Sequence, residues 1–327
     1  MISFIVIGKN VESTLKLCID SILQFIDKNG IKNWEIIYSD SGSSDKSIEI
    51  AGQYPVQIVQ LEGELNAAIG RNEGAKAASG EILFFIDGDM EIISESLHTL
   101  FKNENELAYP YLTGNYTNIY YTHGYQNELK RESFMLRGDT HDFYYRKFTG
   151  GLFLVTKELW QKVNGMDERF DSNQDIDYGL RMTTIGYEQR FYKNVYLAIH
   201  HTVDYYEKKR FSFFIKSTRL LCPGLLIRKH LFKGYFLEYF LRSRYTLILF
   251  IATLLTLSVH SWMAVFLFSF YLLFQLVRTL RSEKLNSSVS IVFLYKILYD
   301  FYSLIGFLFY YPRQKEYTVT QNHQGYE

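Results

Sequence analysis

An uncharged run of 33 residues at 245–277 most constrains the fold of this chain. As one helix it would be about 50 Å long, against a bilayer hydrocarbon core of about 30 Å. One straight span is therefore too long, and the polar break at 259–262 favours a tight helical hairpin. A second apolar stretch, 290–311, carries Lys296 and Asp300, so it either spans the membrane or lies at its interface.

A basic and aromatic segment precedes the uncharged run. Residues 208–244 hold ten Lys or Arg side chains and one acid, Glu238, interleaved with Phe and Leu. This mixture is typical of amphipathic helices on an anionic leaflet, and the positive-inside rule then places this flank on the cytoplasmic side. Nucleic acid would attract similar charge, but the adjoining uncharged run favours membrane lipid as the partner, and no nucleic acid is expected.

The formal net charge of zero conceals two different halves. Residues 201–327 hold 16 basic and 7 acidic side chains, whereas residues 1–200 hold 19 and 28. Halves of opposite charge usually do different jobs. We therefore expect a globular domain at 1–207, basic interfacial helices at 208–244, and at 245–327 the hairpin, a third apolar helix and a short polar tail. Two cysteines, Cys18 and Cys222, exclude a disulfide scaffold, and residues 1–8 resemble a buried strand rather than a signal peptide.

Strand-like and helical patterns alternate through the acidic half. Apolar runs at 2–7, 34–38, 56–61 and 82–86 are separated by helical patterns at 11–25, 44–51 and 66–78. This rhythm predicts an α/β fold, a mostly parallel sheet flanked by helices. Because ligands bind at the carboxyl ends of such strands, the informative residues should follow the strands directly.

Two polar clusters do follow predicted strands. Residues 39–45 come after the second strand, and a turn with a helix cap explains all of them except Asp40. Asp87, Asp89 and Glu91 come after the fourth strand, and an extended backbone would point all three the same way. Because like charges so close repel, they predict a site for Mg²⁺ or Mn²⁺.

Other phosphate-handling classes fit this pattern less well. The sequence has no Walker A or dinucleotide glycine motif, so a metal would have to clamp any phosphate. Phosphatases of the haloacid dehalogenase type also place Asp-x-Asp after a strand, but usually after the first strand and before Thr or Val. Here the pair follows the fourth strand and Met90 comes next, which disfavours that class.

Residues 1–200 resemble the family 2 glycosyltransferases, inverting enzymes with the A-type nucleotide-sugar fold (GT-A). The resemblance rests on seven short motifs in the family's order, each weak alone. They are IVIGKN at 5–10, DSGSSD at 40–45, GRNEG at 70–74, DGD at 87–89, GG at 150–151, VNGMDE at 163–168 and QDID at 174–177.

The resemblance implies a nucleotide-sugar site at the strand ends. The loop with Gly8 and Asn10 would hold the base together with Asp40, whose carboxylate suits the uracil N3–H and so favours a UDP-sugar. Arg71 would lie on the nucleotide side, and Asp87 would contact the ribose.

The resemblance also implies the metal ligands. Asp87 and Asp89 would hold Mg²⁺ or Mn²⁺ against the diphosphate. Glu91 matches a position where some members carry a third ligand, and either His200 or His201 matches a ligating histidine in others.

Asp175 matches the family's general base, because inversion needs one carboxylate on the face opposite the leaving group. The usual Glu-Asp pair reads Gln174-Asp175 here, which removes one charge but leaves the base. Gly150, Gly151, Gln174 and Asp177 are assigned to the acceptor side. The structural alternative is that Asp175 and Asp177 are first-turn helix acids favoured by the macrodipole.

The sequence therefore predicts a membrane-attached, metal-dependent inverting glycosyltransferase in the plasma or inner membrane, with its catalytic domain on the cytoplasmic side. It would move sugar from a nucleotide diphosphate to a hydroxyl or phosphate, on a lipid or lipid-linked acceptor, in cell envelope polysaccharide or glycolipid synthesis. A processive polysaccharide synthase should show a Gln-x-x-Arg-Trp motif, which is not found. A non-catalytic membrane scaffold on a transferase fold is disfavoured by the presence of Asp40, Asp87, Asp89 and Asp175 together.

Overall fold

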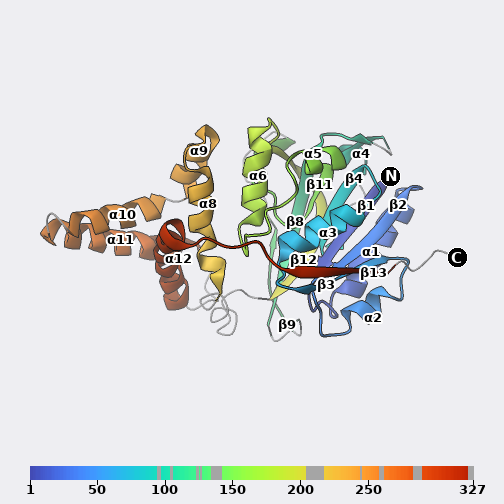
Figure 1. The fold of residues 1–327 in the computed structure, drawn as a ribbon, viewed down its shortest axis with the longest axis horizontal. Helices are drawn as coiled ribbons and strands as arrows, with labels where there is room; N and C mark the ends of the chain where they lie inside the picture. Colours follow the sequence, from blue (N-terminus) through green and yellow to red (C-terminus); the bar gives the residue numbers. More distant parts are fainter. Residues whose placement is uncertain are drawn as a thin grey trace. The chain divides into compact units, whose positions relative to one another are not determined.

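The fold is described from a computed structural model of the chain (Figure 1). The structure describes residues 1–93, 97–103, 106–122, 125, 127–133, 142–203, 217–243, 245–257, 261–282 and 289–322. They form two compact units. The sheet unit comprises Met1–Phe170, Gln174–Asp204 and Gln314–Glu327, and the helical unit comprises Asp171–Asn173 and Tyr205–Arg313.

The first half of the sheet unit alternates strands and helices as predicted. The strands are β1 (Ile2–Gly8), β2 (Trp34–Asp40), β3 (Gln57–Gly63) and β4 (Ile82–Asp87), and the helices between them are α1 (Leu15–Lys28), α2 (Ser47–Ala51) and α3 (Ala67–Ala77). The spatial order is β3-β2-β1-β4, with every neighbouring pair parallel. The α/β prediction is confirmed.

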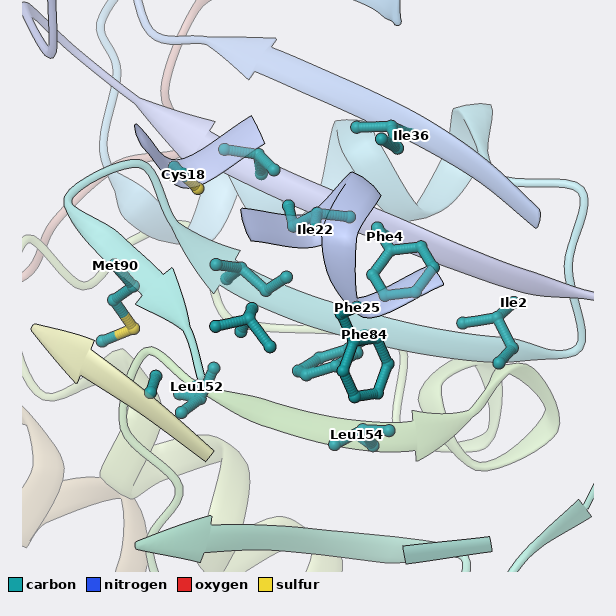
Figure 2. Packing of buried hydrophobic residues seen from close by; sticks show 14 of the residues in the cluster. Ile2, Phe4, Cys18, Ile22, Phe25, Ile36, Phe84, Met90, Leu152 and Leu154 are labelled. Atoms are coloured by element: carbon teal, nitrogen blue, oxygen red, sulfur yellow. The ribbon is translucent and has the colours of Figure 1, made fainter. Parts of the chain in front are cut away.

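The strand β1 is apolar except for Ser3, because helices cover both of its faces. On one face Phe4 packs against Phe25 of α1 and Phe84 of β4, with ring centroids 6.2 and 5.5 Å from that of Phe4 (Figure 2). On the other face Ile5 meets α3 so closely that a Cβ on Gly74 would lie 2.4 Å from it. The two cores hold the carboxyl ends of the parallel strands in register.

Beyond β4 the sheet becomes mixed, in the order β4-β11-β8-β12-β10. The strand β11 is antiparallel to β4 and β8, and β12 is parallel to β8. The remaining elements of this part are α4 (Leu97–Leu100), α5 (Lys157–Lys162), α6 (Gln174–Thr184), β5 (Met90–Ile92), β6 (Phe101–Asn103), β7 (Glu106–Leu107), β8 (Tyr111–Thr122), β9 (Asn127–Ser133), β10 (Phe143–Arg146), β11 (Phe153–Thr156) and β12 (Gln189–Val203).

The other edge of the sheet is formed by the end of the chain. The strand β13 (Tyr317–Asn322) pairs antiparallel with β3. The Tyr317 hydroxyl lies 2.7 Å from Glu73 Oε1 and 3.3 Å from Glu168 Oε1. This strand corrects two expectations. Residues 317–322 are not part of a polar tail, and the sheet unit does not end at residue 207 but includes the segment from Gln314. The residues of β13 are largely exposed, and the run of strand-forming residues at 317–320 is too short to predict the pairing with β3.

The helical unit contains η1 (Thr218–Leu220), α8 (Cys222–His230), α9 (Gly234–Ser243), α10 (Tyr245–Leu257), α11 (Ser261–Ser282) and α12 (Val289–Phe309). The predicted hairpin is seen in α10 and α11, which pair Phe250 with Tyr271 and Tyr245 with Phe274. Its turn at 258–260, and residues 208–216 of the basic segment, lie outside the described residues. By length and composition, α11 and α12 are the two helices of the described chain able to cross a membrane singly.

We expect Tyr317→Phe to lower the free energy of unfolding of the sheet unit by about 1–3 kcal/mol, because it removes a hydroxyl shared by two carboxylates. Burial, followed by the nearby Glu73 and Glu168, raises the pKa of Tyr317, so the hydroxyl keeps its proton at neutral pH. Urea unfolding of the full chain in detergent measures the change. In a Trp262→Phe background, fluorescence reports only on Trp34 and Trp160 of the sheet unit.

Thr320→Ala is the matched control, since Thr320 is an exposed residue of the same strand. Its effect should stay within about 0.5 kcal/mol. Equal effects of the two variants would show that the Tyr317 hydroxyl does not anchor β13.

Candidate active site

The carboxyl ends of three parallel strands bring several predicted residues to one edge of the sheet. Gly8 ends β1 opposite Asp40, which ends β2. Asp87 ends β4 opposite Ile7. This is the edge at which parallel α/β sheets bind ligands.

Asp40 is part of the turn that follows β2. Its side chain is 1% exposed and accepts hydrogen bonds from the Tyr38 hydroxyl at 3.0 Å and the Ser43 amide at 2.8 Å. From the sequence, Asp40 is expected to take no part in forming this turn. The structure corrects that expectation, because the Asp40 carboxylate holds the turn closed. Contact between Asp40 and a nucleotide base stays a prediction.

Asn10 joins the loops that follow β1 and β2. Its Oδ1 accepts from the Ser44 amide at 2.8 Å, and its own amide donates to Ser43 Oγ at 2.9 Å. At Gly8 a Cβ would lie 2.7 Å from Val11 Cγ2, so a side chain there would push the loop away from the strand. Gly8 and Asn10 thus shape one composite loop surface.

A buried ion pair lies at the end of β4. Arg71 of α3 is 4% exposed, and its Nη2 lies 2.6 Å from Asp87 Oδ1. Its Nε has no hydrogen-bond partner among the described residues. On the other side of this carboxylate, a Cβ on Gly151 would lie 1.9 Å from Asp87 Oδ2. Any side chain at position 151 would collide with Asp87, so this position requires glycine. From the sequence, Gly151 is assigned to the acceptor side. Its neighbour Gly150 has φ +97°, which also favours glycine.

Asp175 lies in the first turn of α6 and is half-buried. Burial raises its pKa, while the positive charge of Arg71, backbone amides and Arg146 oppose the rise. The same guanidinium therefore acts on Asp87 and on Asp175. Beside it, Gln174 has a buried Oε1 with no partner in the described part of the chain. The structure thus brings Arg71, Asp87 and Asp175 together.

Asp177 faces the interior instead. It is 0% exposed and lies 2.8 Å from Arg181 Nε, whose Nη2 donates to the Gly165 carbonyl at 2.7 Å. This ion pair joins α6 to the segment that follows α5. The assignment of Asp177 to the acceptor side is corrected, because its side chain anchors α6 within the fold.

Asp89 and Glu91 are separated from Asp87 by a turn at 88–89. The prediction of three acids on one extended run is therefore wrong. Each of the two pairs instead with a histidine of β12. His200 Nε2 lies 3.4 Å from Asp89 Oδ2, and His201 Nε2 lies 3.3 Å from Glu91 Oε2.

The Asp89–His200 pair suits a divalent cation in part. His200 Nδ1 lies 2.8 Å from Asn118 Oδ1, a residue that no sequence motif indicated. When neutral His200 donates Nδ1–H to that oxygen, its Nε2 lone pair faces a carboxylate, an arrangement that a cation stabilises. Among the described residues no group of three or more His, Cys, Asp or Glu is arranged around one point. At this point the described residues therefore offer two ligands, Asp89 and His200, and Mg²⁺ or Mn²⁺ commonly takes others from water and phosphate.

Comparisons with known proteins agree with the resemblance. The family model of glycosyl transferase family 2 matches residues 3–156. The chain is 29% identical over 196 residues to glycosyltransferase GlyG of Streptococcus pneumoniae serotype 4, covering 52% of this chain and 62% of GlyG. It is 27% identical over 169 residues to the GalNAc(5)-diNAcBac-PP-undecaprenol beta-1,3-glucosyltransferase of Campylobacter jejuni, covering 49% and 53%. The matches thus cover less than two thirds of these relatives. A crystal structure of S. aureus TarS 1-349 is similar with a TM-score of 0.45 and 16% identity, over 69% of this chain and 65% of that one.

We expect Asp175→Asn to stabilise the sheet unit at neutral pH and to have no such effect in acid. Burial raises the pKa of Asp175 above its unfolded value of about 4, so the folded state binds the proton more tightly. That stability is fully present below the unfolded pKa and is lost as pH rises through the folded pKa. Asn cannot ionise and so escapes the loss.

Urea unfolding at pH 7 and near pH 4, followed by the fluorescence of Trp34 and Trp160, measures the effect. Asp27→Asn is the control, because Asp27 is exposed and should give little change at either pH. A destabilised Asp175→Asn protein at pH 7 would contradict the assignment of burial as the dominant influence.

Proposed function

We propose that this chain, which belongs to glycosyl transferase family 2, is a membrane-attached inverting transferase that moves sugar from a nucleotide diphosphate to a lipid or lipid-linked acceptor. The observation that carries the proposal is the Arg71–Asp87 ion pair at the carboxyl edge of the sheet, whose positive charge also acts on Asp175 of α6. These groups answer two needs of the reaction, which are stabilisation of a departing diphosphate and removal of a proton from the acceptor.

Donor binding is assigned to the loops after β1, β2 and β4. Asp40, at the end of β2, is assigned to accept the N3–H of a uracil base, which favours a UDP-sugar. The buried Arg71 supplies positive charge beside Asp87, where the ribose and diphosphate would lie. Asp89 and His200 would hold Mg²⁺ or Mn²⁺, and such an ion would neutralise charge on the diphosphate.

Proton removal is assigned to Asp175. Its raised pKa makes it a better proton acceptor than an exposed carboxylate, and the nearby Arg71 charge favours its ionised form. Gln174 places no second negative charge beside it. A single ionisable base is what a one-step inverting displacement requires.

A membrane acceptor is supported by the segment just before α6. Residues Asp171–Asn173 belong to the helical unit, where Ser172 Oγ donates to the Arg219 carbonyl at 2.8 Å and Thr218 Oγ1 donates to Asp171. The next residue is Gln174, so the proposed base Asp175 follows in sequence directly after a segment that belongs to the unit with the apolar helices. The Campylobacter relative, whose name contains PP-undecaprenol, supports a lipid-linked acceptor. We place the protein in the plasma or inner membrane with its sheet unit cytoplasmic.

We expect Asp175→Asn to bind nucleotide sugar normally and to lose at least about 10²-fold in turnover, because Asn keeps the shape but cannot take a proton. Asp177→Asn should instead lower stability by about 3–5 kcal/mol, since it removes the carboxylate partner of the largely buried Arg181 charge. The donor is first chosen by thermal-shift screening of UDP-, GDP- and dTDP-sugars. Turnover and donor affinity of the full chain are then measured for both variants, and the reverse order of effects would place the base at the other carboxylate.

We expect turnover to require Mg²⁺ or Mn²⁺ and Asp89→Asn to abolish it, because this carboxylate is the chain's anionic ligand beside His200. Calorimetric titration with Mn²⁺ and UDP provides a second readout that is independent of turnover. Glu91→Gln, which alters the neighbouring pair with His201, should have the smaller effect on both. Full activity in excess EDTA would rule out the metal site.

A further inference from the structure

The end of the chain restricts the path of the helical unit through a membrane. The strand β13 pairs with β3, so the chain lies on the sheet unit's side both before Tyr205 and after Arg313. A chain that leaves one side and returns to it crosses an even number of times. The three apolar helices α10, α11 and α12 therefore cannot each cross once.

The helices α10 and α11 behave as one inserted element. They are antiparallel, with Phe250 against Tyr271 at 5.4 Å between ring centroids, and they carry the uncharged run 245–277. The outer part of the hairpin is apolar and exposed, with Leu255 67% exposed, Phe266 70% and Trp262 87%. Apolar surface of this extent requires a partner, and its lack of charge suits bilayer hydrocarbon.

The helix α12 is held at the open end of that hairpin by a buried carboxylate. Asp300 is 3% exposed and accepts from Thr246 Oγ1 at 3.2 Å, in the first turn of α10. It also accepts from the Tyr271 hydroxyl at 3.1 Å and from Gln275 Nε2 at 2.7 Å, both on α11. About ten residues of each hairpin helix, roughly 15 Å, extend beyond this level toward the turn.

The carboxyl half of α12 packs on α8, the basic helix. A Cβ on Gly306 would lie 2.1 Å from the Leu221 carbonyl oxygen, so the two backbones touch. Arg228 of α8 donates to the carbonyls of Phe307 at 2.7 Å and Gly306 at 3.2 Å. Arg228 and Lys229 on the same helix suit the headgroup level of an anionic leaflet.

A crossing α12 would also place its charges poorly. Asp300 lies near the middle of Val289–Phe309, so it would reach the bilayer centre, with Lys296 one turn away. Both charges are costly at that depth and are tolerated at the interface. Length and composition alone make α12 a candidate span, but its contacts associate it with the interfacial helix.

We propose that the α10–α11 hairpin enters the bilayer and that α12 stays on the sheet unit's side, lying at the leaflet surface across the hairpin's open end. The polar cluster around Asp300 joins the two elements, and β13 then returns to the sheet. This inference rests on the membrane attachment proposed above and extends it by assigning a position to each helix.

Single cysteines in the full chain test the arrangement. Ser261→Cys lies at the hairpin tip and Ser290→Cys at the start of α12, and both positions are exposed. Lys32→Cys marks the sheet unit's side, and the wild type serves as a blank because Cys18 and Cys222 are buried. Sealed vesicles of each orientation are treated with a membrane-impermeant maleimide. We expect Ser290→Cys to react from the same side as Lys32→Cys, and Ser261→Cys not to react from that side.

Reaction of Ser290→Cys only from the opposite side would overturn the inference, because α11 and α12 would then be the crossing pair. Trp262→Cys and Val289→Cys repeat the measurement at neighbouring exposed positions if either first variant fails to fold. Alkaline carbonate extraction tests the proposed membrane attachment separately from the proposed position of α12. Release of the wild-type chain by carbonate contradicts both, whereas a retained chain with reversed labelling contradicts only the position of α12.

Discussion

The ion pair between Arg71 and Asp87 is the interaction on which the candidate site depends. A guanidinium that is 4% exposed needs a partner, and the last residue of β4 supplies it. This contact joins α3 to β4. The Asp87 carboxylate also leaves no room for a side chain at Gly151, so the backbone at 150–151 passes directly beside it. The same positive charge acts on Asp175 of α6. Four segments from separate parts of the chain are thus arranged around one charged group.

Much of this arrangement could be predicted from sequence because it is local. Apolar runs covered on both faces signal parallel strands, and the carboxyl ends of such strands locate Gly8, Asp40 and Asp87. Side-chain direction was less predictable. Asp175 and Asp177 are two residues apart on a helix, about 200° around its axis, so they cannot share a face. The i,i+4 spacing of Asp177 and Arg181 predicts that these two side chains pair on one helix face, but it does not show that this face points into the fold.

The parts that sequence reasoning missed depend on contacts between distant residues. The strand β13 is exposed, polar and short, and its pairing joins Tyr317 to Gly63 across most of the chain. Residues 317–320 are strand-forming, but so short a run does not show which strand it pairs with, or that it pairs at all. Likewise, the turn at 88–89 divides three acids that an extended backbone would have aligned, and β12 supplies a separate histidine partner for Asp89 and for Glu91. Pattern arguments identified these acids but not their grouping.

The route of the chain between its two units bears on how a membrane acceptor would meet the base. The backbone passes between the units four times, at 170–171, 173–174, 204–205 and 313–314. Here the second passage directly precedes Asp175, and the last leads into the strand whose Tyr317 hydroxyl contacts Glu168. Glu168 in turn accepts from Asn72, the neighbour of Arg71, at 2.8 Å. Within the sheet unit, Arg71 and Asp175 are thus each connected to a residue close to one of these passages of the backbone. The passages matter to the proposed reaction because proton removal requires a fixed distance between the proposed base, Asp175, and the acceptor.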